Sequence, residues 1–304
     1  MKASINGIKM AFDDHGKGPA VILIHGFPFN RRMWTPQISF LAENGFRVIA
    51  PDLRGFGESE AGEKPFSIRT FSEDVCRLMK HLGIGRAVLV GMSLGGEVVL
   101  DLLRRHPRKV VATTILAPMT PLEDAEEQFR YLSFAELVRE GHRQTAIDGL
   151  CQWFFPKEMS LQSQDMVNNV RQLMESVDSQ TLAKGMTFCA EQQKWMERGE
   201  RHNVPSLVLT GEKDHLSPPQ KSETLAKLLP IGRRQVLREA GHMLNVEAAQ
   251  DLNQYLLGFL KDVSHCKPGY LRLAANRVKT SLNFHFLQDF DEGAETEGDV
   301  IVPV

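Results

Sequence analysis

A glycine-rich pentapeptide, Gly-Met-Ser-Leu-Gly at 91–95, constrains the fold of this chain more than any other stretch. It follows an apolar run at 87–90, which indicates a buried parallel strand, and it precedes residues 96–103, whose composition indicates a helix. A sharp turn between strand and helix strains the serine backbone and brings the two elements so close that the glycines must lack side chains. The sequence therefore predicts Ser93 at the tip of the turn, with the Leu94 amide at a helix N-terminus.

Short apolar runs along the rest of the chain predict further strands. Most are apolar throughout, as in strands that are covered on both faces. Segments with helical spacing alternate with these runs, and Asn6-Gly7 is a two-residue hairpin signal. The alternation predicts an α/β fold with a mostly parallel, twisted sheet and helices on both faces. The expected strands are at 21–24, 46–50, 87–90, 110–116, 205–210 and 234–238, and the expected helices around them are at 34–43, 68–82, 96–103 and 247–263.

The alternation stops in the middle of the chain. Between residues 120 and 203 apolar residues recur at helical spacing without a strong strand signal, so that three or four helices fit. We expect a core formed by 1–119 and 204–263, with 120–203 inserted as a helical cap over the carboxyl ends of the strands, where such sheets place their sites. At 264–304 basic residues precede acidic ones, which predicts a flexible tail; docking through its phenylalanines is the alternative.

Two further side chains follow predicted strands in the way that Ser93 does. Asp214 follows the strand at 205–210, and His242 follows the strand at 234–238. Because the carboxyl ends of parallel strands lie along one edge, the three residues can converge despite their separation in sequence. A serine hydroxyl becomes a good nucleophile when a base takes its proton. His242 is the predicted base, and Asp214 would hold its tautomer and stabilise the imidazolium.

Each of these residues alone has an ordinary structural explanation, because most aspartates and histidines serve turns, caps or cores. Glu212 and His215 are the nearest rivals as acid and base, but their local pattern fits less well. Asp52 and Arg54 are expected to hold a turn-rich loop and not to contact a substrate. The joint occurrence of serine, aspartate and histidine at three strand ends, in this order, is what favours a site.

The loop at 25–28, His-Gly-Phe-Pro, follows the first predicted parallel strand. We expect the Phe27 amide to be a second oxyanion donor beside the Leu94 amide. His25 is expected to support the loop by hydrogen bonds. Aromatic residues of the insertion can line a pocket, although such residues often form the insertion's own core. The candidates for lining a substrate pocket are Met92, Trp153 and Phe155.

Composition restricts the class of protein. The formal net charge of −2 gives no basic field that would favour nucleic acid. No apolar stretch is long enough to cross a bilayer and the N-terminus lacks the apolar segment of a signal peptide, so we expect a cytoplasmic protein. The 4 cysteines lack metal-ligand spacing and are too scattered for a disulfide scaffold, which predicts free thiols. Neither a metal nor another cofactor is expected, and the oligomeric state is left open.

Together these residues resemble the α/β-hydrolase superfamily over roughly residues 5–263. The resemblance implies the branch with a serine nucleophile and one helical cap, which holds 3-oxoadipate enol-lactonases, small carboxylesterases and cofactor-free perhydrolases. The loop at 25–28 is also similar to that of epoxide hydrolases and haloalkane dehalogenases, but those relatives use an aspartate nucleophile where this chain has Ser93. The stretches that carry the resemblance are 25–28, 52–59, 91–96, 211–214 and 240–247.

The resemblance implies a serine hydrolase that cleaves a small carboxylic ester or lactone through an acyl-enzyme intermediate. From its charge and hydropathy we expect no nucleic-acid or membrane partner. A lactonase would need a cation for the carboxylate of its substrate, and Arg31, Arg32 and Arg130 are candidates. Carbon–carbon bond hydrolysis and cofactor-free perhydrolysis on the same triad are alternatives. A slow-turnover ligand receptor or scaffold of the same fold is a further one.

Overall fold

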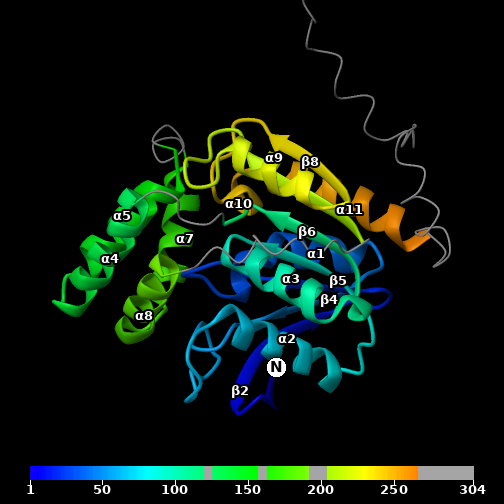
Figure 1. The fold of residues 1–304 in the computed structure, drawn as a ribbon, viewed down its shortest axis with the longest axis horizontal. Coiled ribbons are helices and arrows are strands. Elements are labelled where there is room, and N and C mark those ends of the chain that lie inside the picture. The colour runs from blue at the N-terminus through cyan, green and yellow to red at the C-terminus, as the bar shows by residue number, and fades with distance from the viewer. Residues whose placement is uncertain (120–124, 157–162, 192–203, 266–304) are drawn as a thin grey trace, which may run out of the picture.

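The computed structural model describes residues 1–119, 125–156, 163–191 and 204–265, and its centre is one sheet (Figure 1). The strands are β1 (Lys2–Ile5), β2 (Ile8–His15), β3 (Ala20–Ile24), β4 (Arg47–Pro51), β5 (Ala87–Met92), β6 (Val110–Leu116), β7 (Pro205–Gly211) and β8 (Ile231–Leu237). The 8-stranded sheet has the order β1-β2-β4-β3-β5-β6-β7-β8. β1, β2 and β4 pair antiparallel, and every pairing from β4 through β8 is parallel. The predicted α/β fold with a mostly parallel sheet is confirmed.

The first two strands form the predicted hairpin. Asn6 and Gly7 connect them with φ angles of +50° and +84°, the left-handed conformation that a two-residue turn of this kind requires. The Ile5–Ile8 pair closes the ladder next to the turn, and both side chains are buried. The turn chemistry therefore determines the register of this hairpin.

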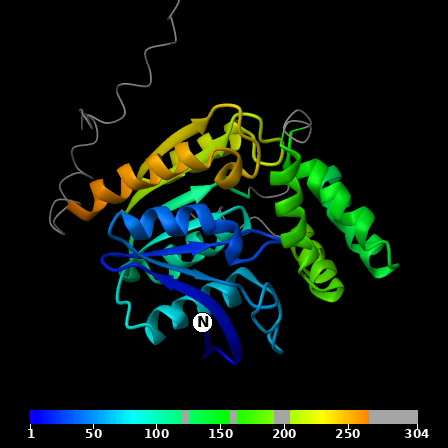
Figure 2. The ribbon, with the colours of Figure 1, turned by 180° about the vertical axis from the view of Figure 1, so that it is seen from behind.

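Helices cover both faces of the sheet, as the sequence predicts. α2 and α3 lie in front of it in Figure 1, whereas α1 and α11 lie on the opposite face in Figure 2. Ser67 begins α2 by accepting a hydrogen bond from the Thr70 amide (3.0 Å). The α-helices outside the insertion are α1 (Thr35–Glu43), α2 (Ile68–His81), α3 (Leu94–Arg105), α9 (Pro219–Leu228), α10 (Leu244–Glu247) and α11 (Ala249–His265). Two short 3₁₀ helices, η1 (Arg31–Trp34) and η2 (Pro107–Lys109), precede α1 and β6.

Four described helices separate β6 from β7, in agreement with the predicted all-helical insertion. They are α4 (Ala125–Arg139), α5 (Arg143–Phe154), α7 (Gln164–Glu175) and α8 (Ser179–Ala190). Figure 1 shows them grouped together at one end of the sheet. The expected junctions at 120 and 203, and the expected tail beyond residue 265, lie outside the described residues. The division into core, cap and tail stays a prediction.

Several element boundaries differ from the prediction by one to three residues. β8 begins at Ile231 instead of residue 234, because Gly232 and Arg233 interrupt the apolar pattern and only their backbone pairing with β7 makes them part of a strand. α3 begins directly after Ser93, so that two glycines form its first turn. None of these shifts changes the topology.

Two other expectations concern the chain as a whole. Cys76, Cys151 and Cys189 carry free thiols, as predicted, and Cys266 lies outside the described residues. In the part of the chain that the structure describes, no helix combines the length and apolar character needed to cross a membrane.

Candidate active site

Ser93 lies in the predicted strained turn. Its φ is +51° and its ψ is −117°, and its amide donates to the Leu116 carbonyl at 2.9 Å. A Cβ on Gly91 would lie 2.2 Å from the Gly95 carbonyl oxygen, and a Cβ on Gly95 would lie 2.1 Å from the Ile24 carbonyl oxygen. These approaches exclude any side chain there. The expected strain at the serine and the expected need for glycine are both confirmed.

The structure brings His242 and Asp214 together. His242 Nδ1 lies 2.9 Å from Asp214 Oδ2 and 3.1 Å from Oδ1, and both side chains are buried. The amides of Leu216 and Ser217 donate to Asp214 Oδ1 at 2.9 and 2.8 Å. These donors fix the carboxylate, which makes Nδ1 the protonated nitrogen of a neutral imidazole.

The other imidazole nitrogen, Nε2, has no hydrogen-bond partner recorded among the described residues. The same holds for Ser93 Oγ, and the Ser93 side chain is partly exposed. Both atoms belong to loops at the carboxyl-end edge of the sheet, after β5 and β8. A base and its nucleophile often align only when a substrate binds, so this arrangement is compatible with the predicted roles.

The rivals for acid and base lie elsewhere. His215 is exposed, and Glu212 is an exposed residue whose Oε2 accepts a hydrogen bond from the Glu239 amide at 3.0 Å. Neither side chain is recorded in contact with His242 or Asp214. Their positions thus agree with the sequence pattern, in which Glu212 and His215 fit the roles of acid and base less well.

The loop at 25–28 lies directly beside the elbow. A Cβ on Gly26 would approach Ser93 Cβ to 3.4 Å. Within the described ranges, the Phe27 and Leu94 amides have no recorded acceptor, and their role as oxyanion donors stays a prediction. The Phe27 ring is buried against the rings of Phe56 and Tyr131, with centroids 6.0 and 6.5 Å away. The Phe27–Pro28 peptide bond is cis.

His25 supports this loop, as predicted. Its Nδ1 lies 2.9 Å from the Gly26 carbonyl oxygen, and its Nε2 accepts a hydrogen bond from the Leu53 amide at 2.9 Å. The side chain is fully buried, and this desolvation lowers the pKa of the imidazole. Both nitrogens are occupied, so His25 is a neutral structural histidine.

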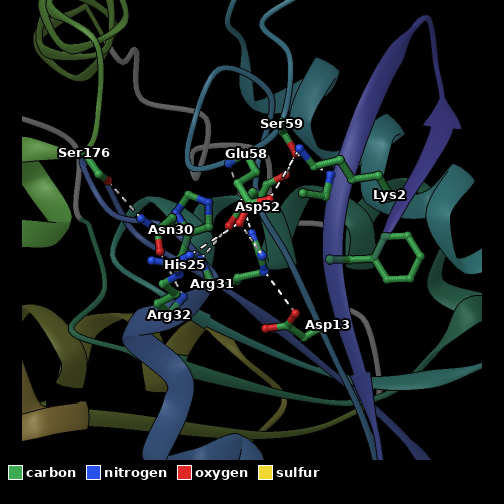
Figure 3. A network of polar contacts seen from close by, with 12 residues as sticks. Lys2, Asp13, His25, Asn30, Arg31, Arg32, Asp52, Glu58, Ser59 and Ser176 are labelled. Carbon is green, nitrogen blue, oxygen red and sulfur yellow. Dashed lines mark hydrogen bonds and ion pairs between the residues drawn. The ribbon is translucent and has the colours of Figure 1, made fainter.

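Asp52 also has a structural role. Its carboxylate accepts from the Arg31 amide and the Glu58 amide, both at 2.8 Å, and pairs with the Arg31 guanidinium. Arg31 also reaches Asp13 and Glu58, at 3.1 and 2.9 Å, so that acidic side chains surround one buried cation (Figure 3). The desolvation penalty is outweighed by these carboxylates, which raise the pKa of Arg31. The network fastens the loop after β4 to the loop after β3.

Arg54, like Asp52, holds its loop. It forms a bidentate pair with the buried Asp74, with distances of 2.6 and 2.7 Å. Its Nη1 and Nη2 also donate to the Ala61 and Asn6 carbonyls at 3.3 and 3.4 Å. The pair anchors the turn-rich loop to α2.

The three predicted pocket residues differ in burial and packing. Met92 is fully buried at the end of β5, and Phe155 is buried directly after α5. Trp153 is only half-buried and packs against Tyr131, with ring centroids 5.0 Å apart, and beneath the Arg130 guanidinium at 5.6 Å. The packing of Trp153 within the inserted helices fits the alternative of an insertion core. Their role in a pocket stays a prediction.

Two further residues contact the His242 loop: Phe154, one of the insertion aromatics that the sequence offers for a pocket, and Glu247, which sequence reasoning did not assign to the site. The Phe154 ring stacks on the His242 imidazole, with centroids 5.4 Å apart and planes 19° apart. Glu247 accepts hydrogen bonds from Gly241 and Met243, on either side of His242. The sequence offered a weak signal for Glu247, five residues after His242 in the matching stretch 240–247, and none that separates Phe154 from its neighbours.

No group of histidine, cysteine, aspartate or glutamate side chains with the arrangement of a metal site occurs among residues 1–119, 125–156, 163–191 and 204–265. The acidic residues that cluster around Arg31 are engaged by its guanidinium.

Comparison with known proteins identifies the family. A model described as alpha/beta hydrolase fold matches residues 19–249. A putative non-heme chloroperoxidase from Synechocystis sp. is 29% identical over 266 residues, which cover 84% of this chain and 95% of that relative. Bifunctional epoxide hydrolase 2 from Rattus norvegicus is 27% identical over 298 residues and 84% of this chain, but this chain spans about half of its length (54%).

A solved structure extends the likeness to an esterase. The thermophilic esterase from Thermogutta terrifontis has a TM-score of 0.79 and 28% identity, covering 86% of this chain and 98% of its own. The names of these similar proteins cover several chemistries, whereas the fold and the matched stretch are shared. The chain belongs to the α/β hydrolase fold family.

Proposed function

We propose that this protein is a serine hydrolase that cleaves a small, uncharged carboxylic ester or lactone through an acyl-enzyme intermediate. The observation that carries the proposal is the buried His242–Asp214 pair, 2.9 Å between Nδ1 and Oδ2, on the same sheet edge as the strained Ser93. A carboxylate on one imidazole nitrogen makes the other nitrogen a base. The 28% identical esterase supports an ester as the substrate.

The first half of the proposed reaction acylates the serine. Ser93 Oγ bonds to the substrate carbonyl carbon while its proton passes to His242 Nε2. The Phe27 and Leu94 amides stabilise the negative oxygen that forms. His242 then gives the proton to the leaving oxygen, the carbon–oxygen bond breaks, and the acyl group remains on Ser93. In a lactone the leaving hydroxyl stays attached to that acyl group.

The second half releases the acid. A water molecule gives a proton to His242 and bonds to the acyl carbon, and the same two amides hold the second oxyanion. The bond to Ser93 Oγ then breaks, and this oxygen takes the proton back from His242. Asp214 keeps the imidazole oriented and stabilises its charged form in both halves.

The preference for an uncharged substrate comes from the arginines. Arg31 is buried in the network shown in Figure 3. Arg32 pairs with Glu58 at 3.5 Å, and Arg130 pairs with Glu126. Each candidate for binding a substrate carboxylate is thus already next to an acidic side chain. A carboxylate placed in an apolar site without a cation is strongly disfavoured, so these pairings favour a neutral acyl group.

The proposal is tested by labelling the intact protein with a fluorophosphonate probe, which reacts with activated serines. We expect labelling of the wild type and loss of labelling in Ser93→Ala and His242→Ala. Turnover of p-nitrophenyl acetate should fall on the order of 10⁴-fold in Ser93→Ala. A Ser93→Ala protein that keeps full ester hydrolysis would refute the assignment.

Matched substrates test the neutral acyl group. A neutral ester and its analogue with a terminal carboxylate should differ in kcat/KM by at least about tenfold, in favour of the neutral ester. A preference for the carboxylate analogue that disappears in Arg32→Ala or Arg130→Ala would restore the carboxylate-binding lactonase.

Perhydrolysis is the second candidate function. The 29% identical relative is described as a putative non-heme chloroperoxidase, and hydrogen peroxide can replace water in the second half of the reaction proposed above. Peroxide-dependent halide oxidation that requires Ser93 and exceeds ester hydrolysis would favour it. Turnover of a dienoate ring-fission product would favour carbon–carbon hydrolysis, and a single stoichiometric burst with p-nitrophenyl acetate would favour the receptor or scaffold.

A further inference from the structure

One carboxylate brackets the backbone of His242. Glu247 Oε2 accepts a hydrogen bond from the Gly241 amide at 2.7 Å, and Oε1 accepts one from the Met243 amide at 2.8 Å. Glu247 ends the short helix α10, so its side chain reaches back along the loop that carries the imidazole. The two residues next to His242 are therefore fastened to a single rigid group.

Only a carboxylate can make this bracket, because it offers two acceptor oxygens in one plane. A glutamine in the same place would turn its NH₂ group toward one of the two amides, which are themselves donors. An aspartate is shorter by one methylene and cannot span both amides from the same backbone position. The residue type is thus matched to the two donors around His242.

Neutral contacts already hold this loop to the body of the protein. Asn245 Nδ2 donates to the Met33 carbonyl at 2.8 Å, and Gln37 Nε2 donates to the Asn245 carbonyl at 2.9 Å. A Cβ on Gly241 would lie 2.5 Å from Pro156, so the residues after α5 also press on the loop. Attachment alone does not call for a buried negative charge.

The charge of Glu247 lies where it is poorly solvated. Burial raises the pKa of this carboxyl to about 7, although the Gly241 and Met243 amides act to lower it. The titratable groups that act on it are His242, whose positive form would stabilise the carboxylate, and Asp214, which opposes it. By reciprocity, the Glu247 carboxylate stabilises the imidazolium of His242.

We propose that Glu247 is a positioning residue for His242: its carboxylate aligns the histidine backbone so that Nδ1 meets Asp214, and its negative charge adds to that of Asp214 in stabilising the imidazolium. This inference rests on the proposed function, in which His242 is the base. Glu247 touches neither substrate nor the reacting atoms. Its two contributions, geometry and charge, are separable by substitution.

Glu247→Gln removes the charge and half of the bracket, and Glu247→Asp keeps the charge but cannot span both amides. In Glu247→Gln, kcat should fall about 10- to 100-fold, with a smaller change in KM. The pKa of His242, followed by NMR in protein with ¹⁵N-labelled histidine, should fall, because a negative charge near the imidazole is removed.

Glu247→Asp should lose kcat while the pKa of His242 stays near its wild-type value. Asn245→Ala is the matched control, because it loosens the same loop without changing a charge near the imidazole. It should lower the melting temperature and leave the pKa of His242 in place.

The proposal is overturned if Glu247→Gln lowers only the melting temperature, as Asn245→Ala does, with kcat and the pKa of His242 unchanged. A wild-type kcat in Glu247→Asp would overturn the geometric part of the proposal. If Glu247→Gln fails to fold, the kcat of Glu247→Asp still decides the geometric part. The NMR titration needs no substrate, so it tests Glu247 even where absent fluorophosphonate labelling refutes the proposed function.

Discussion

Two buried histidines sit in loops that follow parallel strands, and they differ in how many ring nitrogens are occupied. His25, after β3, engages backbone groups through both nitrogens, the Gly26 carbonyl and the Leu53 amide, each at 2.9 Å. His242, after β8, gives Nδ1 to Asp214 and has no recorded partner for Nε2 within the described ranges. Burial and position at the sheet edge are shared. The nitrogen left over for a proton is what separates a structural histidine from a candidate base.

The carboxylates near the two histidines also differ in their ionic partners. Asp52, the carboxylate that acts on His25, is paired with the guanidinium of Arg31. Asp214 has no lysine or arginine partner in the described part of the chain, and its recorded ionic partner is His242 itself. A carboxylate that already has a cation contributes little to a new positive charge nearby. Asp214 is therefore available to an imidazolium, whereas the charge of Asp52 is shared with Arg31.

The largest expected loss of kcat follows from replacing Asp214, the carboxylate that pairs with His242. Asp214→Asn should lower kcat on the order of 10⁴-fold, because the amide leaves the imidazole in the wrong tautomer and removes its counter-charge. The matched variant Asp52→Asn should lower the melting temperature, since Arg31 loses a buried partner, while kcat per folded molecule stays within about tenfold. Steady-state kinetics with active-site titration checks both. Equal losses of kcat in the two variants would contradict the proposed difference between Asp214 and Asp52.

The aromatic neighbours of the two histidines give the next prediction. Phe154 stacks on His242 with planes 19° apart, whereas Phe56 meets His25 edge-on at 73°. Replacing either phenylalanine by alanine should lower the free energy of unfolding by about 3–5 kcal/mol, because both rings are fully buried.

The two replacements should differ in the pH profile. A stacked ring face stabilises a cation, so that Phe154→Ala should move the acid limb of kcat/KM to lower pH, and Phe56→Ala should leave it in place. Urea unfolding and pH–rate profiles measure the two properties separately. A shift of the acid limb in Phe56→Ala would link His25 to the chemistry.

Glu247 gives the His242 loop a pH-dependent stability. Burial raises the pKa of its carboxyl from 4.5 to about 7, so the folded protein binds an extra proton between these values. The stability tied to this group is therefore fully present below pH 4.5 and is lost as the pH rises through 7. The loss is at most about 3 kcal/mol. The difference in unfolding free energy between wild type and Glu247→Gln should fall by up to that amount across this range, and a constant difference would contradict it.

The stability of the His25 loop should respond to pH in the opposite sense. Burial lowers the pKa of His25 below its usual 6.5, so the unfolded chain binds more protons at mildly acid pH. Its contribution to stability is present above pH 6.5 and is lost as the pH falls toward the folded-state pKa.

His25→Gln should remove this pH dependence and lower the free energy of unfolding by about 1–3 kcal/mol, for backbone groups left without a partner. The kcat/KM profile should keep its limbs. Chemical unfolding between pH 5 and 8, with circular dichroism as the readout, tests the first statement, and a displaced limb would contradict the second.

The sequence by itself determined the sheet, the hairpin and the elbow. These features depend on local signals: apolar runs of strand length, the Asn6–Gly7 turn, and the glycines around Ser93 that no other residue can replace. The positions of Asp214 and His242 also follow from the sequence, because parallel strands place every carboxyl end along one edge. The shared edge made their convergence predictable without knowledge of any contact.

Only the tertiary structure decided which neighbours reach His242. Of the adjacent Trp153, Phe154 and Phe155, the ring that stacks on the imidazole depends on how α5 is rotated against the sheet, and all three have the same apolar character in the sequence. The Glu247 bracket and the burial of Arg31 among carboxylates likewise depend on pairings between separate loops. Local signals record which residues suit a turn, a strand or a helix, whereas a contact between two elements is set by the packing of both.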